Sequence, residues 1–349
     1  MLLVENVQQQ LQLLLQQRQT LTQNRYTGFT QLRQHDNRLA DCVQLAADCG
    51  SDNNTPDWLL WLLDADHSAS LTLTQLAGFT RPSEVWLLLH ELKSRRSPLQ
   101  KQIVATQLQQ INDDNAGLNW ALATRLQLTL NPFTTPTAGT AEALWYLLYS
   151  AQTALLPALT GYVKQLPPHS PLLPMCHLVA YLFGDKTDES ALVAALAAVG
   201  QLTEPALMLL LAGASDTVQS RIVNQLSNDS NTAHQAIAAM GYSGQLKFVP
   251  LLLELAQAED SREAATGSLT ILLGIAEADS LLSAASATAD FHLAQGHARQ
   301  LSGGHINSVQ LDNVWLSGNQ QQRQLVACYR SLATAGTPLL NANALSCRL

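Results

Sequence analysis

The chain has 349 residues, of which 47% are hydrophobic, 5% are aromatic and 13% are charged, and its formal net charge is −8 at pH 7. Only 19 Lys and Arg residues stand against 27 Asp and Glu residues, which argues against a dedicated nucleic-acid-binding face. Leu, Ala and Gln dominate and β-branched runs are scarce, so the composition predicts an all-α fold.

Cysteine usage and hydropathy predict a cytoplasmic protein with no membrane span. The most apolar long stretch, residues 191–214, is interrupted by polar residues and Pro205, so it predicts two core helices. The N-terminus lacks the basic region and apolar core of a signal peptide. The five cysteines form no C-x-x-C pair, which favours thiols in a reducing compartment; they are Cys42, Cys49, Cys176, Cys328 and Cys347.

The first half of the chain shows helical patterns at irregular spacing. A Leu- and Gln-rich helix opens the chain, and Gly50 ends the helix that follows it. Pro82 starts another helix, with Glu84 in its first turn. The helices predicted here are 3–24, 27–49, 57–63, one that begins at Pro82, 97–110, 114–130 and 139–164.

A basic cluster lies toward the end of the helix that begins at Pro82. It consists of Lys93, Arg95 and Arg96, with Lys101 nearby. The cluster favours a solvated helix end, because cations near a helix C-terminus complement the helix dipole. The alternative is a local patch for nucleic acid.

The Pro-rich passage 167–174 predicts a bend between two halves of one array. We therefore expect an N-terminal helical region over 1–166, HEAT-like repeats over 175–335 and a C-terminal segment over 336–349. In the repeat region Gly200, Gly241 and Gly274 are each predicted to end an alanine-rich helix, at spacings typical of helical hairpins. The last helices are predicted at 307–317 and 319–333.

Stacked hairpins of this kind predict an α-solenoid of HEAT-like repeats, preceded by a less regular helical region. One hairpin cannot bury its apolar face alone, so each repeat needs neighbours. Solenoids present extended surfaces that usually bind other macromolecules.

No residues form a convincing catalytic, cofactor or metal site. Asp64 to His67 are adjacent residues at a predicted helix end, without a partner at metal-ligand spacing. Cys176 and His177 are neighbours on an apolar helix and point about 100° apart, which favours core packing over a catalytic dyad. Gly303-Gly304 lacks the lysine of a phosphate loop. Three histidines near the C-terminus are loosely spaced and only weakly suggest metal binding: His292, His297 and His305.

Several aromatic residues are either core residues or exposed anchors for a partner. Core packing is the commoner role of such side chains, but a buried aromatic anchor is also typical of protein interfaces. The partner-binding candidates are Trp58, Trp61, Tyr146 and Arg323.

Three segments together resemble a family of uncharacterised bacterial HEAT-like proteins. The first contains Leu32-Arg33-Gln34-His35-Asp36-Asn37-Arg38-Leu39-Ala40, and the second runs from Ala236 to Gly274. The third runs from Gly318 to Leu340 and includes Gln322-Arg323-Gln324. The chain departs from the family pattern at Leu251 and at residues 266–269.

Members of that family are typically encoded near type VI secretion genes. The resemblance implies a cytoplasmic accessory of that system, such as an effector adaptor, a chaperone or an immunity-like protein. Its partner would be a secreted effector or a component of the spike complex.

These observations favour a non-enzymatic protein-binding scaffold without a cofactor. One alternative is a HEAT-type enzyme that processes nucleic acid or acts as a small-molecule lyase, which would need a cationic groove with aromatic residues and a carboxylate. The other alternative is a structural homo-oligomer whose repeats mainly pack on each other.

Overall fold

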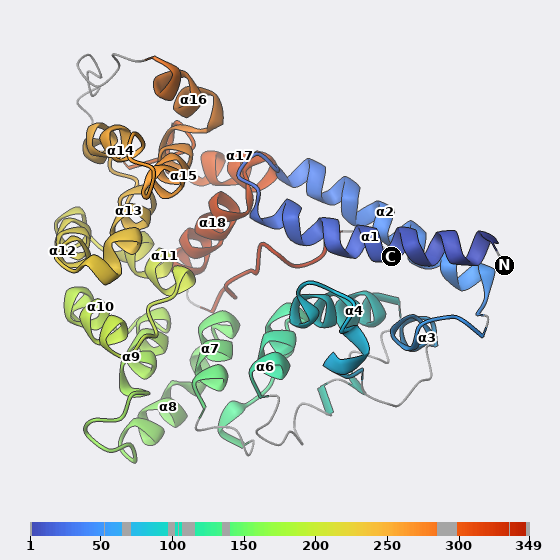
Figure 1. The fold of residues 1–349 in the computed structure, drawn as a ribbon. Helices are drawn as coiled ribbons and strands as arrows, with labels where there is room; N and C mark the ends of the chain where they lie inside the picture. Colours follow the sequence, from blue (N-terminus) through green and yellow to red (C-terminus); the bar gives the residue numbers. More distant parts are fainter. Residues whose placement is uncertain are drawn as a thin grey trace. The chain divides into compact units, whose positions relative to one another are not determined.

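The structure is a computed structural model that describes residues 2–51, 53–64, 71–96, 102–103, 105–106, 116–134, 140–284, 299–334 and 336–346. Over these residues the chain is mostly α-helical, which confirms the all-α prediction (Figure 1). Its two strands in this part of the chain are short and form one hairpin. None of the described helices is both long and apolar enough to cross a membrane.

The chain divides into two compact units, and the division differs from the predicted one. Unit 1 comprises Met1–Ser150 and Asn343–Leu349, and unit 2 comprises Ala151–Ala342. The boundary therefore lies before the Pro-rich passage 167–174, which is inside unit 2 between two of its helices. The predicted C-terminal segment 336–349 is split, because its last residues belong to unit 1.

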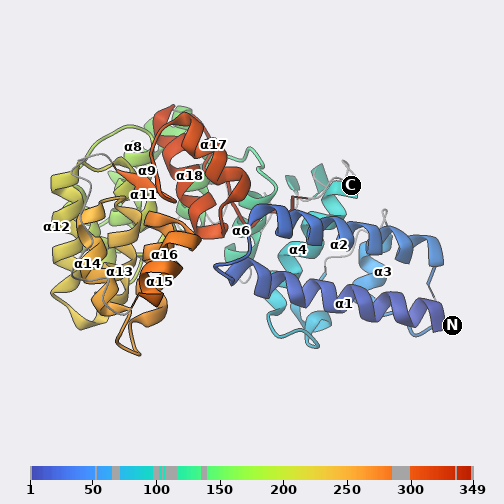
Figure 2. The same cartoon turned by 90° about the horizontal axis from the view of Figure 1, so that it is seen from above.

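Unit 1 is built around a pair of long helices, α1 and α2, which lie side by side (Figures 1 and 2). Their facing stripes carry Leu11 and Leu15 on α1 and Leu39 and Val43 on α2, all fully buried in one core. The elements of unit 1 are α1 (Leu2–Gln23), α2 (Phe29–Cys49), α3 (Asp57–Leu63), η1 (Leu73–Leu76), α4 (Pro82–Arg96), α6 (Ala116–Arg125), η3 (Pro132–Thr134) and α7 (Ala141–Ser150). The bounds of α3 are those predicted from the sequence.

In the described part of unit 2 the helices are shorter than α1 and α2. They are η4 (Thr153–Leu155), α8 (Leu156–Val163), α9 (Leu173–Leu182), α10 (Glu189–Ala198), α11 (Glu204–Gly213), α12 (Asp216–Ser227), η5 (Ser230–Thr232), α13 (Ala233–Tyr242), η6 (Leu246–Phe248), α14 (Val249–Leu255), α15 (Arg262–Leu273), α16 (Ile275–Ser283), the strands β1 (Gln300–Leu301) and β2 (Gly304–His305), α17 (Ser308–Ser317) and α18 (Gln320–Ala333). The last two helices begin and end within one residue of their predicted bounds.

The helices of unit 2 pack in a regular order. Helix α12 pairs with α13, and α14 pairs with α15. Between pairs, α11 packs on α13 and α13 packs on α15, while α10 packs on α12. One row of this unit therefore consists of α11, α13 and α15.

Helix α18 contacts two helices of that row, α11 and α15. It packs on α11, and its Gln322 Nε2 donates to the Thr270 carbonyl of α15 at 3.0 Å. Gln321 donates to Glu204 of α11 at 2.9 Å. Most of α18 is buried, including residues 325–328. The C-terminal helix of unit 2 is thus a central element of its core.

The glycines of the repeat region take two different roles. Gly200 and Gly274 follow α10 and α15 with positive φ angles of 67° and 83°, as expected for residues that end helices. Gly241 was predicted to end its helix, and α13 does end one residue later, at Tyr242, but Gly241 is itself helical and the positive φ angle of 73° falls on Gly244. A Cβ atom at Gly241 would lie 2.8 Å from the Ser268 Cα atom of α15, so glycine permits the close crossing of the two helices.

The pair Gly303-Gly304 forms part of a β-hairpin that the sequence did not reveal. Ser302 and Gly303 have φ angles of 53° and 79°, which is the pattern of a type I′ turn. Their N–H groups donate to the Ile271 and Leu272 carbonyls at 2.7 and 2.8 Å. The hairpin turn therefore satisfies carbonyl groups at the end of α15.

Candidate functional site

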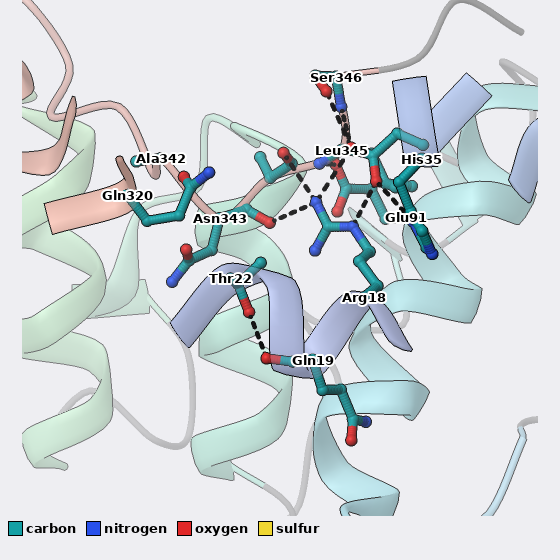
Figure 3. Close-up of polar contacts among 12 residues, drawn as sticks. Arg18, Gln19, Thr22, His35, Glu91, Gln320, Ala342, Asn343, Leu345 and Ser346 are labelled. Carbon is teal, nitrogen blue, oxygen red and sulfur yellow. Dashed lines mark hydrogen bonds and ion pairs between the residues drawn. The ribbon is translucent and has the colours of Figure 1, made fainter. Parts of the chain in front are cut away.

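Four charged side chains of unit 1 contact the C-terminal residues Asn343–Ser346, here called the tail. They are Arg18 of α1, Asp36 of α2, and Glu91 and Arg95 of α4, and we call them the tail site. Figure 3 shows two of them, Arg18 and Glu91, beside Asn343 and Leu345. Arg18 is 4% exposed, Asp36 is fully buried and Glu91 is 2% exposed. Buried charges are costly without partners, so this cluster needs an explanation.

Two of these residues occupy positions on the apolar stripes of paired helices. Arg18 follows Leu14 by four residues on the buried face of α1, and Asp36 follows Leu32 by four on α2. The two side chains meet in a bidentate pair: Arg18 Nε lies 2.7 Å from Asp36 Oδ1, and Nη2 lies 3.2 Å from Oδ2. The fork geometry makes this the strong form of the Arg–carboxylate contact.

The tail is bound mainly through its main chain. Arg18 Nη2 donates to the carbonyls of Asn343 and Ala344 at 3.0 and 3.2 Å. The Leu345 N–H donates to Glu91 Oε1 at 2.6 Å, and Arg95 donates to the Leu345 carbonyl. The Glu91 carboxylate therefore accepts a hydrogen bond from an N–H group of the tail, and the two guanidinium groups donate hydrogen bonds to its carbonyls.

Two side chains of the tail add to this recognition. The Ser346 N–H and hydroxyl both donate to Asp36 Oδ2, each at 2.9 Å. Leu345 is 4% exposed and belongs to the apolar core of unit 1. The site thus encloses the apolar side chain of Leu345. Its Asp36 carboxylate accepts two hydrogen bonds from the following tail residue, Ser346.

Neighbouring charges hold the site together. Burial alone raises the pKa of Asp36, but Arg18 and the hydrogen bonds from its neighbours outweigh burial and keep the pKa well below its ordinary value. Glu91 has its own cations: Arg95 lies 3.2 Å away on the same helix, and Arg125 Nη1 of α6 lies 3.7 Å from Oε2. Both carboxylates are therefore paired with cations of unit 1 as well as with the tail.

The four partner-binding candidates named from the sequence are all interior residues. Trp58 is 6% exposed and packs edge-on against Phe79 at 5.6 Å. Tyr146 is 1% exposed, and its hydroxyl donates to the Leu128 carbonyl at 2.5 Å. Trp61 and Arg323 are 5% and 4% exposed.

Arg323 is held by its own unit. Its Nε donates to the Trp315 carbonyl at 3.1 Å and its Nη1 to the Ala342 carbonyl at 3.2 Å. Its guanidinium also lies 4.5 Å from the centre of the Trp315 ring. The exposed-anchor interpretation is therefore wrong for these four residues, and packing within the units accounts for them.

The basic cluster lies in the last turn of α4, as predicted, but it is solvated only in part: Arg95 is exposed, while Lys93 is buried and Arg96 is half-buried. Lys93 is 3% exposed, and its Nζ donates to the Trp61 carbonyl at 2.8 Å and lies 4.1 Å from the centre of the Trp61 ring. Arg96 donates to the Leu62 carbonyl at 3.2 Å. The two cations thus bind carbonyls at the end of α3, where the helix dipole is negative. Lys101 lies outside the described residues.

The remaining sequence candidates form no site in the described part of the chain. Cys176 is buried and His177 is exposed, so the two side chains do not face each other. No group of His, Cys, Asp and Glu residues suited to a metal ion occurs among the described residues. His305 is exposed, while residues 65–67, His292 and His297 lie outside the described residues.

The sequence contained one signal for the tail site. Arg18 and Asp36 are charged residues at stripe positions where the helical period requires apolar side chains. The tail itself carried no such signal. Among known proteins, no protein-family model, no curated protein and no solved structure matches this chain.

Proposed function

We propose that the protein is a non-enzymatic scaffold that binds a non-helical segment of another protein at the tail site. The observation that supports this proposal is that buried charges from α1, α2 and α4 are directed at main-chain atoms of a non-helical segment. Main-chain groups are present in every protein, so such a site suits a polypeptide ligand.

The balance of donors and acceptors supports a peptide over a charged small molecule. Arg18 and Arg95 supply N–H donors, and Asp36 and Glu91 supply carboxylate acceptors at nearby points. A peptide segment presents both carbonyls and N–H groups and can satisfy both kinds of group. An anion would bind the guanidinium groups but would be repelled by the two carboxylates.

Unit 2 fits the HEAT-like solenoid that we propose for this region. Its pairs α12–α13 and α14–α15 stack in sequence order, which is the neighbour-to-neighbour contact pattern of helical-hairpin repeats.

The cellular role that we propose is the one implied by the family resemblance. The protein would be a cytoplasmic accessory of type VI secretion that holds an effector or a spike component as an adaptor, chaperone or immunity-like protein. The resemblance includes residues 32–40, and Asp36 of this segment takes part in the tail site.

The test is recovery of a partner by the tagged full chain from its native cytoplasm, followed by cross-linking of the purified pair. We expect one protein at a one-to-one ratio, with cross-links near the tail site. Retention of nucleic acid on the chain, or binding to heparin at low salt, would favour the nucleic-acid alternative. A concentration-dependent mass without any foreign protein would favour the homo-oligomer.

A further inference from the structure

We propose that the tail is a displaceable ligand that closes the tail site in cis, and that a partner binds by inserting a non-helical segment with leucine followed by serine or threonine. The inference rests on the proposed function and specifies the ligand and its regulation. Its first support is that the tail behaves as a bound peptide. Residues 341–346 form no helix or strand, and Asn343 is exposed.

The tail is also distant in sequence from everything it contacts. Arg18 and Asn343 are 325 residues apart, and Glu91 and Leu345 are 254 apart. The tail directly follows Ala342, the last residue of unit 2. It is therefore a separate piece of chain within unit 1, and unit 2 lies between it and the rest of unit 1 in the sequence.

The contacts define which segment can replace the tail. The Leu345 and Ser346 positions each use their N–H group, so proline is excluded from both. The Leu345 position is enclosed, which requires an apolar side chain. A hydroxyl at the Ser346 position donates to Asp36, so serine or threonine is preferred there. At the Asn343 and Ala344 positions the carbonyls accept hydrogen bonds from Arg18.

Loss of the tail does not leave an isolated charge in unit 1. Arg18 and Asp36 stay paired with each other at 2.7 Å, and Glu91 keeps Arg95 at 3.2 Å. Removal of one member of a buried pair is strongly destabilising, whereas an intact pair that loses one neutral donor loses much less. The site is therefore organised before a ligand arrives, which suits exchange of one segment for another.

A tethered tail competes strongly with a free peptide. Short flexible tethers give effective concentrations in the millimolar range, so a micromolar ligand would bind the intact protein at least about tenfold more weakly than an open site. A segment could therefore displace the tail only if its affinity for the site is high, or if it is attached to a partner that is already docked on the protein.

The experiment uses the full chain with two changes in the tail, Leu345→Asp and Ser346→Pro. The first change places a carboxylate beside Glu91, and the second removes both donors to Asp36. The probe is a dye-labelled peptide with the sequence of residues 340–346. We expect it to bind the double variant at least about tenfold more tightly than the wild-type chain, measured by fluorescence anisotropy.

The matched control variant is Leu45→Asp, which puts the same charge on the exposed face of α2 and leaves the tail unchanged. It should bind the probe as weakly as the wild type. A probe with aspartate in place of the leucine should bind none of the three chains. Equal, weak binding of the original probe to a folded double variant and to the wild type would overturn the proposal.

A second measurement covers the case in which the double variant fails to fold. Hydrogen exchange of the wild-type chain is followed at the Leu345 and Ser346 N–H groups with excess unlabelled peptide. We expect faster exchange at these two groups, and no change with a scrambled peptide. No acceleration would show that the tail is a permanent part of unit 1. Neither assay uses a partner protein. A negative result in them therefore contradicts displacement of the tail, whereas failure to recover a partner from the cytoplasm contradicts the proposed function.

Discussion

The His90 imidazole lies between two tryptophan rings of unit 1. Its ring centre is 4.0 Å from that of Trp86 and 4.5 Å from that of Trp61. In the described part of the chain its Nε2 atom has no hydrogen-bond partner. Burial, helped by the Lys93 ammonium, lowers the pKa of His90 to about 3. The folded protein therefore holds this ring neutral in a place where charge is costly.

This lowered pKa predicts a loss of stability in mild acid. Between pH 6.5 and pH 3 the unfolded chain binds a proton at His90 that the folded chain does not, so the free energy of unfolding falls as pH falls. We expect His90→Phe to make this fall shallower by up to about 1.4 kcal/mol per pH unit. Urea unfolding across that range measures the slope. His177→Gln, at an exposed imidazole, should leave it unchanged.

Asp36 predicts a second, larger effect. Asp36→Asn would remove the carboxylate that pairs with the buried Arg18 guanidinium at 2.7 Å, and breaking a buried ion pair costs about 3–5 kcal/mol of unfolding free energy at pH 7. Because the folded pKa is depressed, the stability from Asp36 is present above about pH 4 and is lost as pH falls below it. Urea titration at pH 7 should show the loss. A similar loss in Asp41→Asn, at an exposed position of the same helix, would contradict the argument.

At the scale of elements, the crossing of α13 and α15 depends on one missing side chain. A Cβ atom at Gly241, in the last turn of α13, would meet the Cα atom of Ser268 in the middle of α15 at 2.8 Å. We expect Gly241→Ala to lower the unfolding free energy of unit 2 by about 1–3 kcal/mol, because the backbones must separate. Gly267→Ala on α15 is the control, since nothing lies within 4 Å of its added Cβ.

Thermal unfolding of the two variants should change in opposite directions. Gly267→Ala should raise stability by about 0.5–1 kcal/mol, because alanine is the better helix former. If both variants were stabilised, the two helices would not be in close contact at Gly241.

The sequence predicted the helices better than their contacts. The apolar period and the flanking Pro and Gly residues set α3, α17 and α18 within about one residue, because these signals are local. Gly241 shows the limit of such signals. A glycine that ends a helix and a glycine that admits a neighbouring helix look alike in sequence, and only the partner helix distinguishes them. The same limit applies to Lys93, whose partner is a carbonyl of α3.

At the scale of the whole molecule, the sequence could not reveal that the last residues belong to unit 1. The Pro-rich passage 167–174 was the strongest local boundary, yet the structure divides the chain near Ser150 and again near Ala342. Long-range pairs such as Arg18 with Asn343 carry no periodic pattern. The charges at apolar stripe positions indicated that a partner exists but not where it lies in the chain.

Removal of the tail should therefore weaken unit 1 more than unit 2. Each unit contains a buried thiol that can report on its unfolding: Cys42 on α2 in unit 1 and Cys328 on α18 in unit 2. Burial raises the pKa of both thiols, so both should resist alkylation in the folded protein. Cys49, which is half-buried, is the internal control and should react at once.

Deletion of residues 343–349 removes the Leu345 side chain from the core, worth about 1.5–3 kcal/mol, together with the hydrogen bonds to Asp36 and Glu91. In pulse alkylation at increasing urea, we expect Cys42 to become reactive at a lower urea concentration than in the full chain. The midpoint for Cys328 should stay unchanged, because the deleted residues belong to unit 1. Equal shifts at both thiols would show that the two units unfold as one cooperative body, and the tail would then stabilise the whole chain.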